Sequence, residues 1–128
     1  MEDRYLYRAK RKNWRELPKE KWWVEGYLYG IWERRYILWG MINDVPNMIE
    51  VDPSTICQCT GLKDKNGKLI WENDIVKISG HIYVCYWDEY NFEWGLKSKT
   101  ETIGLGYIDK CIIEVIGNIF DNPELLEV

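Results

Sequence analysis

The sequence predicts a mainly β protein, and two observations lead to that class. Aromatic residues make up 15% of the 128 residues, with eight Trp and nine Tyr against two Phe, and aromatic and β-branched side chains favour extended strands. Short alternating or β-branched runs are also separated by Gly, Pro, Asn and Asp, the residues that make turns. A chain of this length suits a single domain over residues 1–128, with roughly two-thirds of its unfolded surface buried.

The first elements predict an aromatic hairpin. Alternation begins at residues 5–8, and two longer runs at residues 22–28 and 31–38 flank Tyr29 and Gly30. A hairpin that turns at Tyr29-Gly30 is the simplest arrangement of these two runs.

A capped helical turn follows a short strand predicted at residues 48–51. Asp52 is placed to cap this turn, and Pro53 occupies its first position, where the missing N–H of proline costs nothing. The pattern therefore predicts either a turn or one turn of helix at residues 52–55, from which residues 56–59 lead into the next element.

The stretch at residues 60–76 has the most distinctive turn chemistry of the chain. Asn66-Gly67 has the spacing of a two-residue hairpin turn, in which both central residues need a positive φ. Residues 69–71 then predict a strand, Glu72-Asn73-Asp74 a second corner, and residues 75–78 another strand. We interpret the acids as turn residues, because Asp64, Glu72 and Asp74 can accept hydrogen bonds from nearby backbone amides.

The last elements predict a second hairpin and a C-terminal strand. Residues 81–87 and 92–96 flank a turn at residues 88–91, and residues 111–116 predict the strand. Asn122 and Pro123 should begin a terminal turn, which would place Leu125 and Leu126 over the core.

Charge is distributed unevenly along the chain. Residues 1–40 contain ten Lys or Arg against six Asp or Glu, and residues 41–128 contain seven against fifteen, within a net charge of −4. Two interpretations stay open: the two parts attract each other or are simply solvated, or the basic part is a functional patch.

Neither a membrane span nor a secretory signal is predicted. A span needs about 20 apolar residues, and a signal needs a basic and then an apolar segment. We therefore expect a cytoplasmic protein without a membrane partner, in which the four cysteines are reduced and behave as small apolar residues on strands.

Four blocks of sequence occur in a characteristic order. Arg8-Ala9-Lys10 precedes Trp23-Val24-Glu25-Gly26-Tyr27, and Val51-Asp52-Pro53-Ser54-Thr55 leads into residues 60–76 and finally residues 114–126. In this order the blocks resemble the YopX family, small proteins encoded by phages and prophages, over nearly the whole chain. The resemblance implies a barrel-like fold of short antiparallel strands with one or two short helical turns. It also implies a protein present in the cytoplasm of the phage-infected or lysogenic bacterial host.

Two positions depart from the family pattern. Cys59 stands at a usual aromatic position, and Asn73 stands at the usual Gly of the second corner. Asn adopts the left-handed conformation more readily than most residues, so we expect the corner to be preserved at modest cost.

We predict no enzymatic activity, catalytic residue, metal site or cofactor. His81 is the only histidine and lies in a strand-like run rather than on a catalytic turn. Asp64 and Asp74 are explained by turn chemistry, although paired acids also occur in hydrolases and magnesium sites. Cys57 and Cys59 should point to opposite faces of a strand, which disfavours a zinc site.

Binding is the function class that these exclusions leave. The basic, aromatic N-terminal third supplies the candidate binding residues, Trp14, Arg15, Trp32, Arg34 and Arg35. We expect an accessory protein that binds a host or phage protein through a surface of the β scaffold. The alternative is a nucleic-acid-binding module in which the cations pair with phosphates and the rings stack on unpaired bases. Self-association through exposed strand edges stays open.

Overall fold

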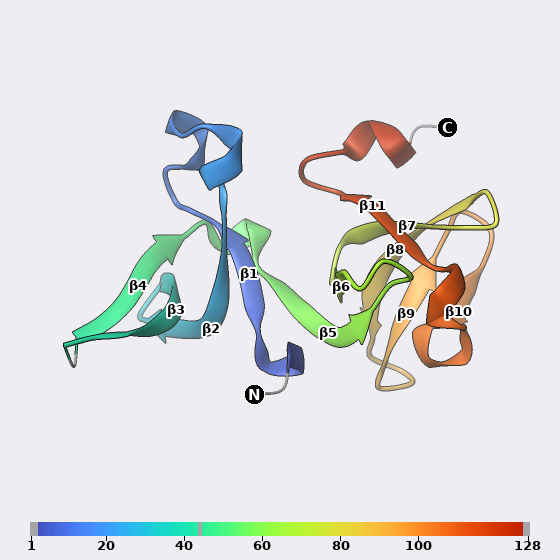
Figure 1. Ribbon diagram of the computed structural model, residues 1–128, viewed down its shortest axis with the longest axis horizontal. Coiled ribbons are helices and arrows are strands. Elements are labelled where there is room, and N and C mark those ends of the chain that lie inside the picture. The colour runs from blue at the N-terminus through green and yellow to red at the C-terminus, as the bar shows by residue number, and fades with distance from the viewer. Residues whose placement is uncertain (1–2, 44, 127–128) are drawn as a thin grey trace. The chain divides into compact units, whose positions relative to one another are not determined.

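The computed structural model describes residues 3–43 and 45–126 (Figure 1). It confirms the mainly β class, because the described residues form eleven strands and seven short 3-10 helices, with no α-helix among them. The chain divides into two compact units, Met1–Cys59 and Thr60–Val128. The boundary falls inside strand β5 (Cys57–Lys63). That residues 1–128 fold as a single domain stays a prediction.

The first unit is an antiparallel sheet with the strand order β4-β3-β2-β1-β5. Its short helices carry the connections: η1 precedes β1, η2 and η3 lie between β1 and β2, and η4 lies between β4 and β5. The bounds are β1 (Tyr7–Lys10), β2 (Trp23–Ile31), β3 (Arg34–Ile42), β4 (Val45–Val51), η1 (Asp3–Tyr5), η2 (Trp14–Glu16), η3 (Lys19–Lys21) and η4 (Pro53–Thr55).

The end of β4 is bonded to the chain just after β1. An isolated antiparallel bridge joins Arg11 to Val51, and the Asp52 amide donates to the Lys10 carbonyl at 2.8 Å. These bonds bring the chain just after β1 against the end of β4. Apart from this bridge, the pairings described for the strands give open sheets rather than a closed barrel.

The inner face of this sheet forms the first core. Ala9, Val24, Ile37 and Val51 are buried together, at alternating positions of four strands, as expected when one face of a sheet is covered. Gly26 lies on the same face, and a Cβ there would stand 2.3 Å from the backbone oxygen of Leu38. The close approach of β2 and β3 therefore requires glycine at this position.

The aromatic hairpin forms, but its predicted turn position is wrong. Strands β2 and β3 are paired out to Ile31 and Arg34, so the turn consists of Trp32 and Glu33 rather than Tyr29 and Gly30. Gly30 is instead a strand residue, and a Cβ there would meet the Arg35 side chain at 3.1 Å. Glycine at position 30 therefore leaves space for the Arg35 side chain and does not form a turn.

The predicted helical turn after β4 is confirmed in detail. The Asp52 carboxylate accepts from the Ser54 amide at 3.1 Å, and Pro53 is the first residue of η4. The strand before this turn was predicted at residues 48–51 and is longer: β4 begins at Val45.

The second unit contains a five-stranded antiparallel sheet with the order β10-β9-β8-β7-β11, and a pairing of β5 with β6. Its bounds are β6 (Leu69–Trp71), β7 (Asp74–Ile78), β8 (His81–Asp88), β9 (Glu93–Lys97), β10 (Thr102–Gly104), β11 (Glu114–Asn118), η5 (Leu105–Tyr107), η6 (Lys110–Ile112) and η7 (Pro123–Leu126). The core of this unit is a single buried cluster that includes Ile70, Val76, Tyr83, Cys85 and Leu96. The predicted hairpin around residues 88–91 is confirmed as β8 and β9, with Phe92 still in the turn.

The turn motif at residues 60–76 is largely confirmed. Asn73 has a φ of 70°, the left-handed conformation expected where the family has glycine. At the first bend Gly67 has a φ of 78°, but Asn66 does not have a positive φ. The bend is wider than a two-residue turn: the Gly67 amide donates to the Asp64 carbonyl and the Asp64 amide to the Lys68 carbonyl. This geometry needs only its last residue in the left-handed region.

The C-terminal strand and one cysteine differ from the prediction. Cys111 and Ile112 belong to η6, and the strand β11 starts only at Glu114. The Asp109 carboxylate accepts from the Cys111 amide at 2.9 Å and so begins the short helix. Cys57, Cys59 and Cys85 are buried, whereas Cys111 is exposed. The terminal turn at Pro123 is confirmed as η7.

Candidate binding surfaces

The outward side of the β2-β3-β4 sheet is unusually apolar. Side chains alternate along a strand, so the residues that do not face the core share this opposite side. The register places Tyr27 beside Leu38, Tyr29 beside Tyr36, and Met48 beside Leu38 from the other strand. We call this set the outer face: Tyr27, Tyr29, Ile31, Arg34, Tyr36, Leu38, Met48 and Glu50.

The outer face remains accessible in the folded chain. Tyr27, Tyr29 and Met48 are 41%, 48% and 38% exposed. The solvent side of an antiparallel sheet normally carries polar residues, and a contiguous exposed apolar patch marks an interaction site. Folding of the first unit does not account for this composition, so the outer face is the strongest candidate binding surface in it.

Charges on and beside the outer face are paired. A hydrogen bond with Tyr36, together with the negative charge of Glu50, raises the pKa of the Arg34 guanidinium. The Lys12 ammonium lies 2.9 Å from a carboxylate oxygen of Glu50. The face therefore presents apolar rings with both signs of charge at its rim, rather than a field of one sign.

The five predicted binding residues fall into two groups. Trp32, Arg34 and Arg35 lie at the β2-β3 corner, where Trp32 is 94% exposed and has a φ of 55°. The Arg35 guanidinium donates to the backbone oxygens of Trp32 and Arg34 at 2.9 and 3.0 Å. Arg35 thus stabilises the turn through these hydrogen bonds. Trp32 and Arg34 are exposed to solvent at the same corner.

Trp14 and Arg15 belong to a different arrangement, built around a buried lysine. The Lys10 side chain is 2% exposed, and its ammonium lies 3.9, 4.3 and 5.5 Å from the ring centroids of Trp14, Trp22 and Trp23. We call Lys10 and these three tryptophans the lysine cage. Attraction of a cation to aromatic rings stabilises such a cluster.

The Trp14 ring is already in contact with the Lys10 ammonium. The Arg15 guanidinium also lies over this ring, at 4.4 Å, and the Trp14 indole N–H donates to the Asp52 carboxylate at 3.2 Å. Trp14 is therefore a part of the fold that holds two cations. Sequence reasoning identified the residue but not its partner Lys10, because a lysine between Ala9 and Arg11 gives no signal of burial.

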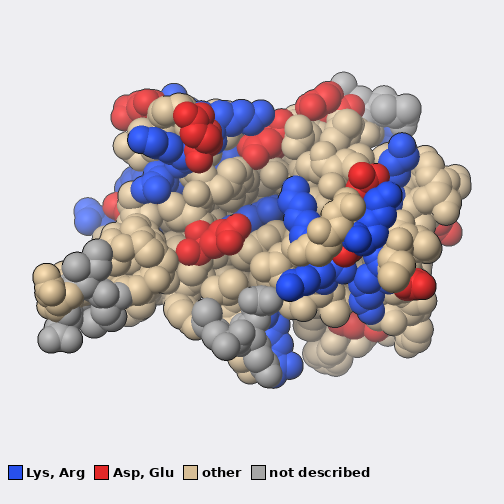
Figure 2. Space-filling view, viewed as in Figure 1, with Lys and Arg blue, Asp and Glu red and all other residues tan. Residues whose placement is uncertain are grey.

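Other cations of the N-terminal third are also engaged. The Arg11 guanidinium donates to the Lys21 carbonyl at 2.8 Å, and the Lys19 ammonium lies 5.8 Å from the Trp22 ring. Figure 2 shows basic and acidic side chains interspersed on this part of the first unit. The basic segment is accordingly a mixed surface on the side that the figure shows.

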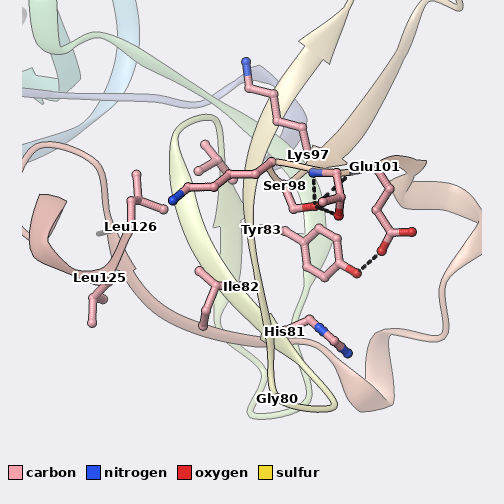
Figure 3. Close-up of a pocket in the computed structure, with 12 residues that line it drawn as sticks. Gly80, His81, Ile82, Tyr83, Lys97, Ser98, Glu101, Leu125 and Leu126 are labelled. Carbon is pink, nitrogen blue, oxygen red and sulfur yellow. Dashed lines mark hydrogen bonds between the residues drawn. The ribbon is translucent and has the colours of Figure 1, made fainter. Parts of the chain in front are cut away.

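The second unit has a cavity of about 660 Å³. It is formed by the start of β8, the end of β9 with the loop that follows it, and the leucines of η7 (Figure 3). The Tyr83 hydroxyl donates to the Glu101 carboxylate; this hydrogen bond, with burial and the negative charge of Glu101, raises the pKa of Tyr83. His81 lines the cavity, as do Leu125 and Leu126, which were predicted to lie over the core.

Polar groups at the cavity largely serve the local structure. The Ser98 hydroxyl oxygen accepts from the amides of Thr100 and Glu101 at 3.3 and 3.2 Å, and the Lys97 ammonium lies 4.8 Å from the Tyr86 ring. Sequence reasoning missed this cavity because its three segments are distant along the chain, and His81, Leu125 and Leu126 were identified there for other reasons.

Two of the three acids of the turn motif, Asp64 and Asp74, accept hydrogen bonds from the backbone. The Asp64 carboxylate accepts from the backbone amides of Asn66, Lys68 and Val115, each at 2.9 Å, and Asp74 accepts from the Trp71 amide at 2.8 Å. Burial alone would raise the pKa of Asp64, but these three amides outweigh it and hold the pKa below its ordinary value. Among the described residues no group of three or more His, Cys, Asp or Glu side chains is arranged to hold a metal ion.

The fold and these surfaces define a small all-β protein with an apolar sheet face and aromatic hairpin corners. The family model described as YopX protein matches residues 7–127, so the chain belongs to the YopX family. The resemblance inferred from the four sequence blocks is thereby confirmed. A comparison with curated proteins gave no match. Within residues 3–43 and 45–126, no helix has both the length and the apolar character needed to cross a membrane.

Proposed function

We propose that this chain is a non-enzymatic accessory protein of a phage or prophage, and that it binds a host or phage protein through the outer face. The observation that carries the proposal is the row of exposed tyrosines and Met48 on the solvent side of β2, β3 and β4. Tyrosine, methionine and arginine are enriched in the cores of protein interfaces. Membership of the YopX family supports the phage origin, and with it a place in the cytoplasm of the infected or lysogenic host.

Charge pairing favours a protein over a nucleic acid as the partner. Phosphate binding needs a net positive surface, whereas Glu50 lies on the outer face beside Arg34 and Lys12. A mixed, paired rim suits a protein partner, because complementary charges of both signs fix the orientation of two proteins.

The proposal is tested by affinity capture from host lysate with matched variants. Tyr29→Glu places a charge in the middle of the outer face, and Tyr107→Glu places one at an 83% exposed tyrosine of the second unit. A partner bound through the outer face should be captured by the wild type and by Tyr107→Glu, and lost with Tyr29→Glu. Circular dichroism verifies that both variants fold. Capture that is equal for all three proteins would contradict the proposal.

The second candidate is a nucleic-acid-binding module in the N-terminal third. The 94% exposed ring of Trp32 beside Arg34 favours it, because such a pair can stack on a base and contact its phosphate. Fluorescence titration with single- and double-stranded DNA and RNA at two salt concentrations tests it. The module predicts binding that weakens steeply with salt and with Trp32→Ala. An absence of binding at low salt would eliminate this candidate.

A further inference from the structure

The β8-β9 hairpin presents two aromatic rings that the fold does not use. Tyr90 is 94% exposed and Phe92 is 80% exposed, both at the corner between Asp88 and Glu93. Single exposed aromatic residues are common on protein surfaces, but here two stand two positions apart in one hairpin turn. We call residues 88–93 the acidic tip.

The backbone conformation of Phe92 in the acidic tip is unfavourable for a phenylalanine. Phe92 has a φ of 52°, a conformation that costs an aromatic residue free energy and that glycine or asparagine adopts more readily. Among the other described non-glycine residues with a positive φ, Asn43, Asn73 and Ser79 have small polar side chains, whereas Trp32 is a second exposed aromatic residue at a hairpin turn. Phe92 gains little burial in return, so folding does not explain why a phenylalanine stands here.

The acidic tip is also held rigidly. One carboxylate oxygen of Asp88 accepts from the amides of Tyr90 and Asn91 at 2.9 and 3.2 Å, and the other accepts from the Asn91 side chain at 2.8 Å. Below the corner, Trp87 and Trp94 pack edge to face with their centroids 5.2 Å apart. A backbone that is already ordered before binding loses less entropy when a partner docks.

Charge indicates what these rings would contact. The acidic tip contains Asp88, Glu89 and Glu93, and the sequence has no Lys or Arg between Lys77 and Lys97. Aromatic faces next to carboxylates attract lysine and arginine side chains through cation–π contact and ion pairing. They repel phosphates, which excludes the backbone of a nucleic acid as the natural ligand.

We propose that the acidic tip binds a segment of a partner protein rich in lysine and arginine. Tyr90 and Phe92 contact the cationic side chains, and Glu89 and Glu93 pair with their charges. The residues of the acidic tip belong to the second unit, and none of them is part of the outer face. The proposal therefore does not depend on the proposed function of the first unit.

The test is a nuclear magnetic resonance titration of the uniformly ¹⁵N-labelled full chain. The probe is a short peptide of alternating arginine and glycine, and the control probe alternates glutamate and glycine. The arginine peptide should shift the amide signals of residues 88–93, whereas the glutamate peptide should leave them unchanged. Equal shifts with both peptides, or shifts confined to other residues, would overturn the proposal.

Two variants separate binding from folding. Phe92→Gly should weaken binding of the arginine peptide roughly threefold to thirtyfold, the range expected for loss of a cation–π contact, while resistance to urea stays equal or rises. Trp32→Ala removes a 94% exposed ring of the first unit and should not change binding. An unchanged affinity in Phe92→Gly, or a clear loss of its stability, would overturn the proposal. Tip signals that shift with protein concentration or with phosphatidylcholine vesicles, and not with the arginine peptide, would assign the tip to self-association or to a membrane instead.

Discussion

At the scale of single residues, Lys10 shows how the first unit uses its tryptophans. A buried ammonium needs compensation for the water it has lost, and the rings of Trp14, Trp22 and Trp23 lie within 3.9 to 5.5 Å of it. Tryptophans that look suited to stacking on bases therefore serve the interior of the unit. Other aromatic residues are exposed on the outer face and at the hairpin corners, among them Tyr29 and Trp32.

Lys10→Met should destabilise the protein clearly. Methionine keeps much of the apolar stem but removes the cation from the lysine cage, which should lower the free energy of unfolding by roughly 1–3 kcal/mol. Lys12→Met is the matched control, because Lys12 forms an exposed ion pair with Glu50 that is worth about 0–1 kcal/mol. Urea unfolding monitored by tryptophan fluorescence measures both. Equal losses of unfolding free energy in the two variants would show that the lysine cage stabilises the protein no more than an exposed ion pair does.

Asp64 should make stability depend on pH in the acid range. Because its pKa in the folded chain is lowered from the ordinary value of 3.8, the carboxylate contributes stability that is fully present above that value. The contribution is lost as the pH falls through 3.8 towards the lower folded pKa. Asp64→Asn should therefore cost roughly 1–3 kcal/mol at neutral pH.

The same variant provides the check on this sign. The stability difference between wild type and Asp64→Asn should shrink as urea unfolding is repeated from pH 7 down to pH 3. Other aspartates with lowered pKa values, such as Asp88 and Asp109, are common to both proteins and cancel in the difference. A gap that stays constant with pH would contradict this role for the Asp64 charge.

At the scale of elements, local chemistry determined what could be predicted from the sequence. The Asp52 cap and the left-handed Asn73 depend on neighbouring residues, and both predictions are confirmed. The position of the first hairpin turn depends on strand pairing: Gly30 makes room for the Arg35 side chain, and the turn falls at Trp32. A glycine in a strand and a glycine in a turn look alike until the register is known.

The candidate surfaces were predictable only in part, for the same reason. Trp32 and Arg34 were identified from composition and are exposed at the β2-β3 corner. Trp14 was identified by the same reasoning but belongs to the lysine cage. The outer face could not be recognised, because side chains on the two sides of a strand differ in exposure only after the sheet has formed.

Gly26→Ala should disrupt the pairing of β2 with β3. The added Cβ would stand 2.3 Å from the Leu38 carbonyl oxygen, which belongs to the backbone and cannot turn away. A loss of roughly 1–3 kcal/mol or more is expected from such overpacking. In the control Gly30→Ala, the new Cβ meets only the Arg35 side chain at 3.1 Å, and the loss should be smaller. Thermal unfolding of both variants measures the difference, and a reversed order would refute this account of Gly26.

At the scale of the whole molecule, the two compact units share one strand. The boundary between Cys59 and Thr60 falls within β5, and the YopX family model spans residues 7–127 of both units. The strand order places β5 between β1 and β6, and β5 pairs with β1 through Cys57 and Gln58, just before the boundary. This continuity supports the prediction of a single domain.

A single domain predicts a single unfolding transition. Tryptophan fluorescence and far-ultraviolet circular dichroism should report the same midpoint in urea. Gly26→Ala in the first unit and Ile70→Ala in the buried core of the second unit should each lower that shared midpoint. Two transitions, of which each variant moves only one, would show instead that the units are separate domains.

The central claim is that the outer face binds a protein, and calorimetric titration of the purified captured partner tests it most directly. Burial of Tyr29 in such an interface predicts that Tyr29→Glu weakens binding by a factor of about 30 or more, an effect of about 2 kcal/mol that is typical of an interface hot spot. Tyr107→Glu should retain the affinity of the wild type. If Tyr29→Glu binds as tightly as the wild type while Tyr107→Glu does not, the partner lies on the second unit and the claim is wrong.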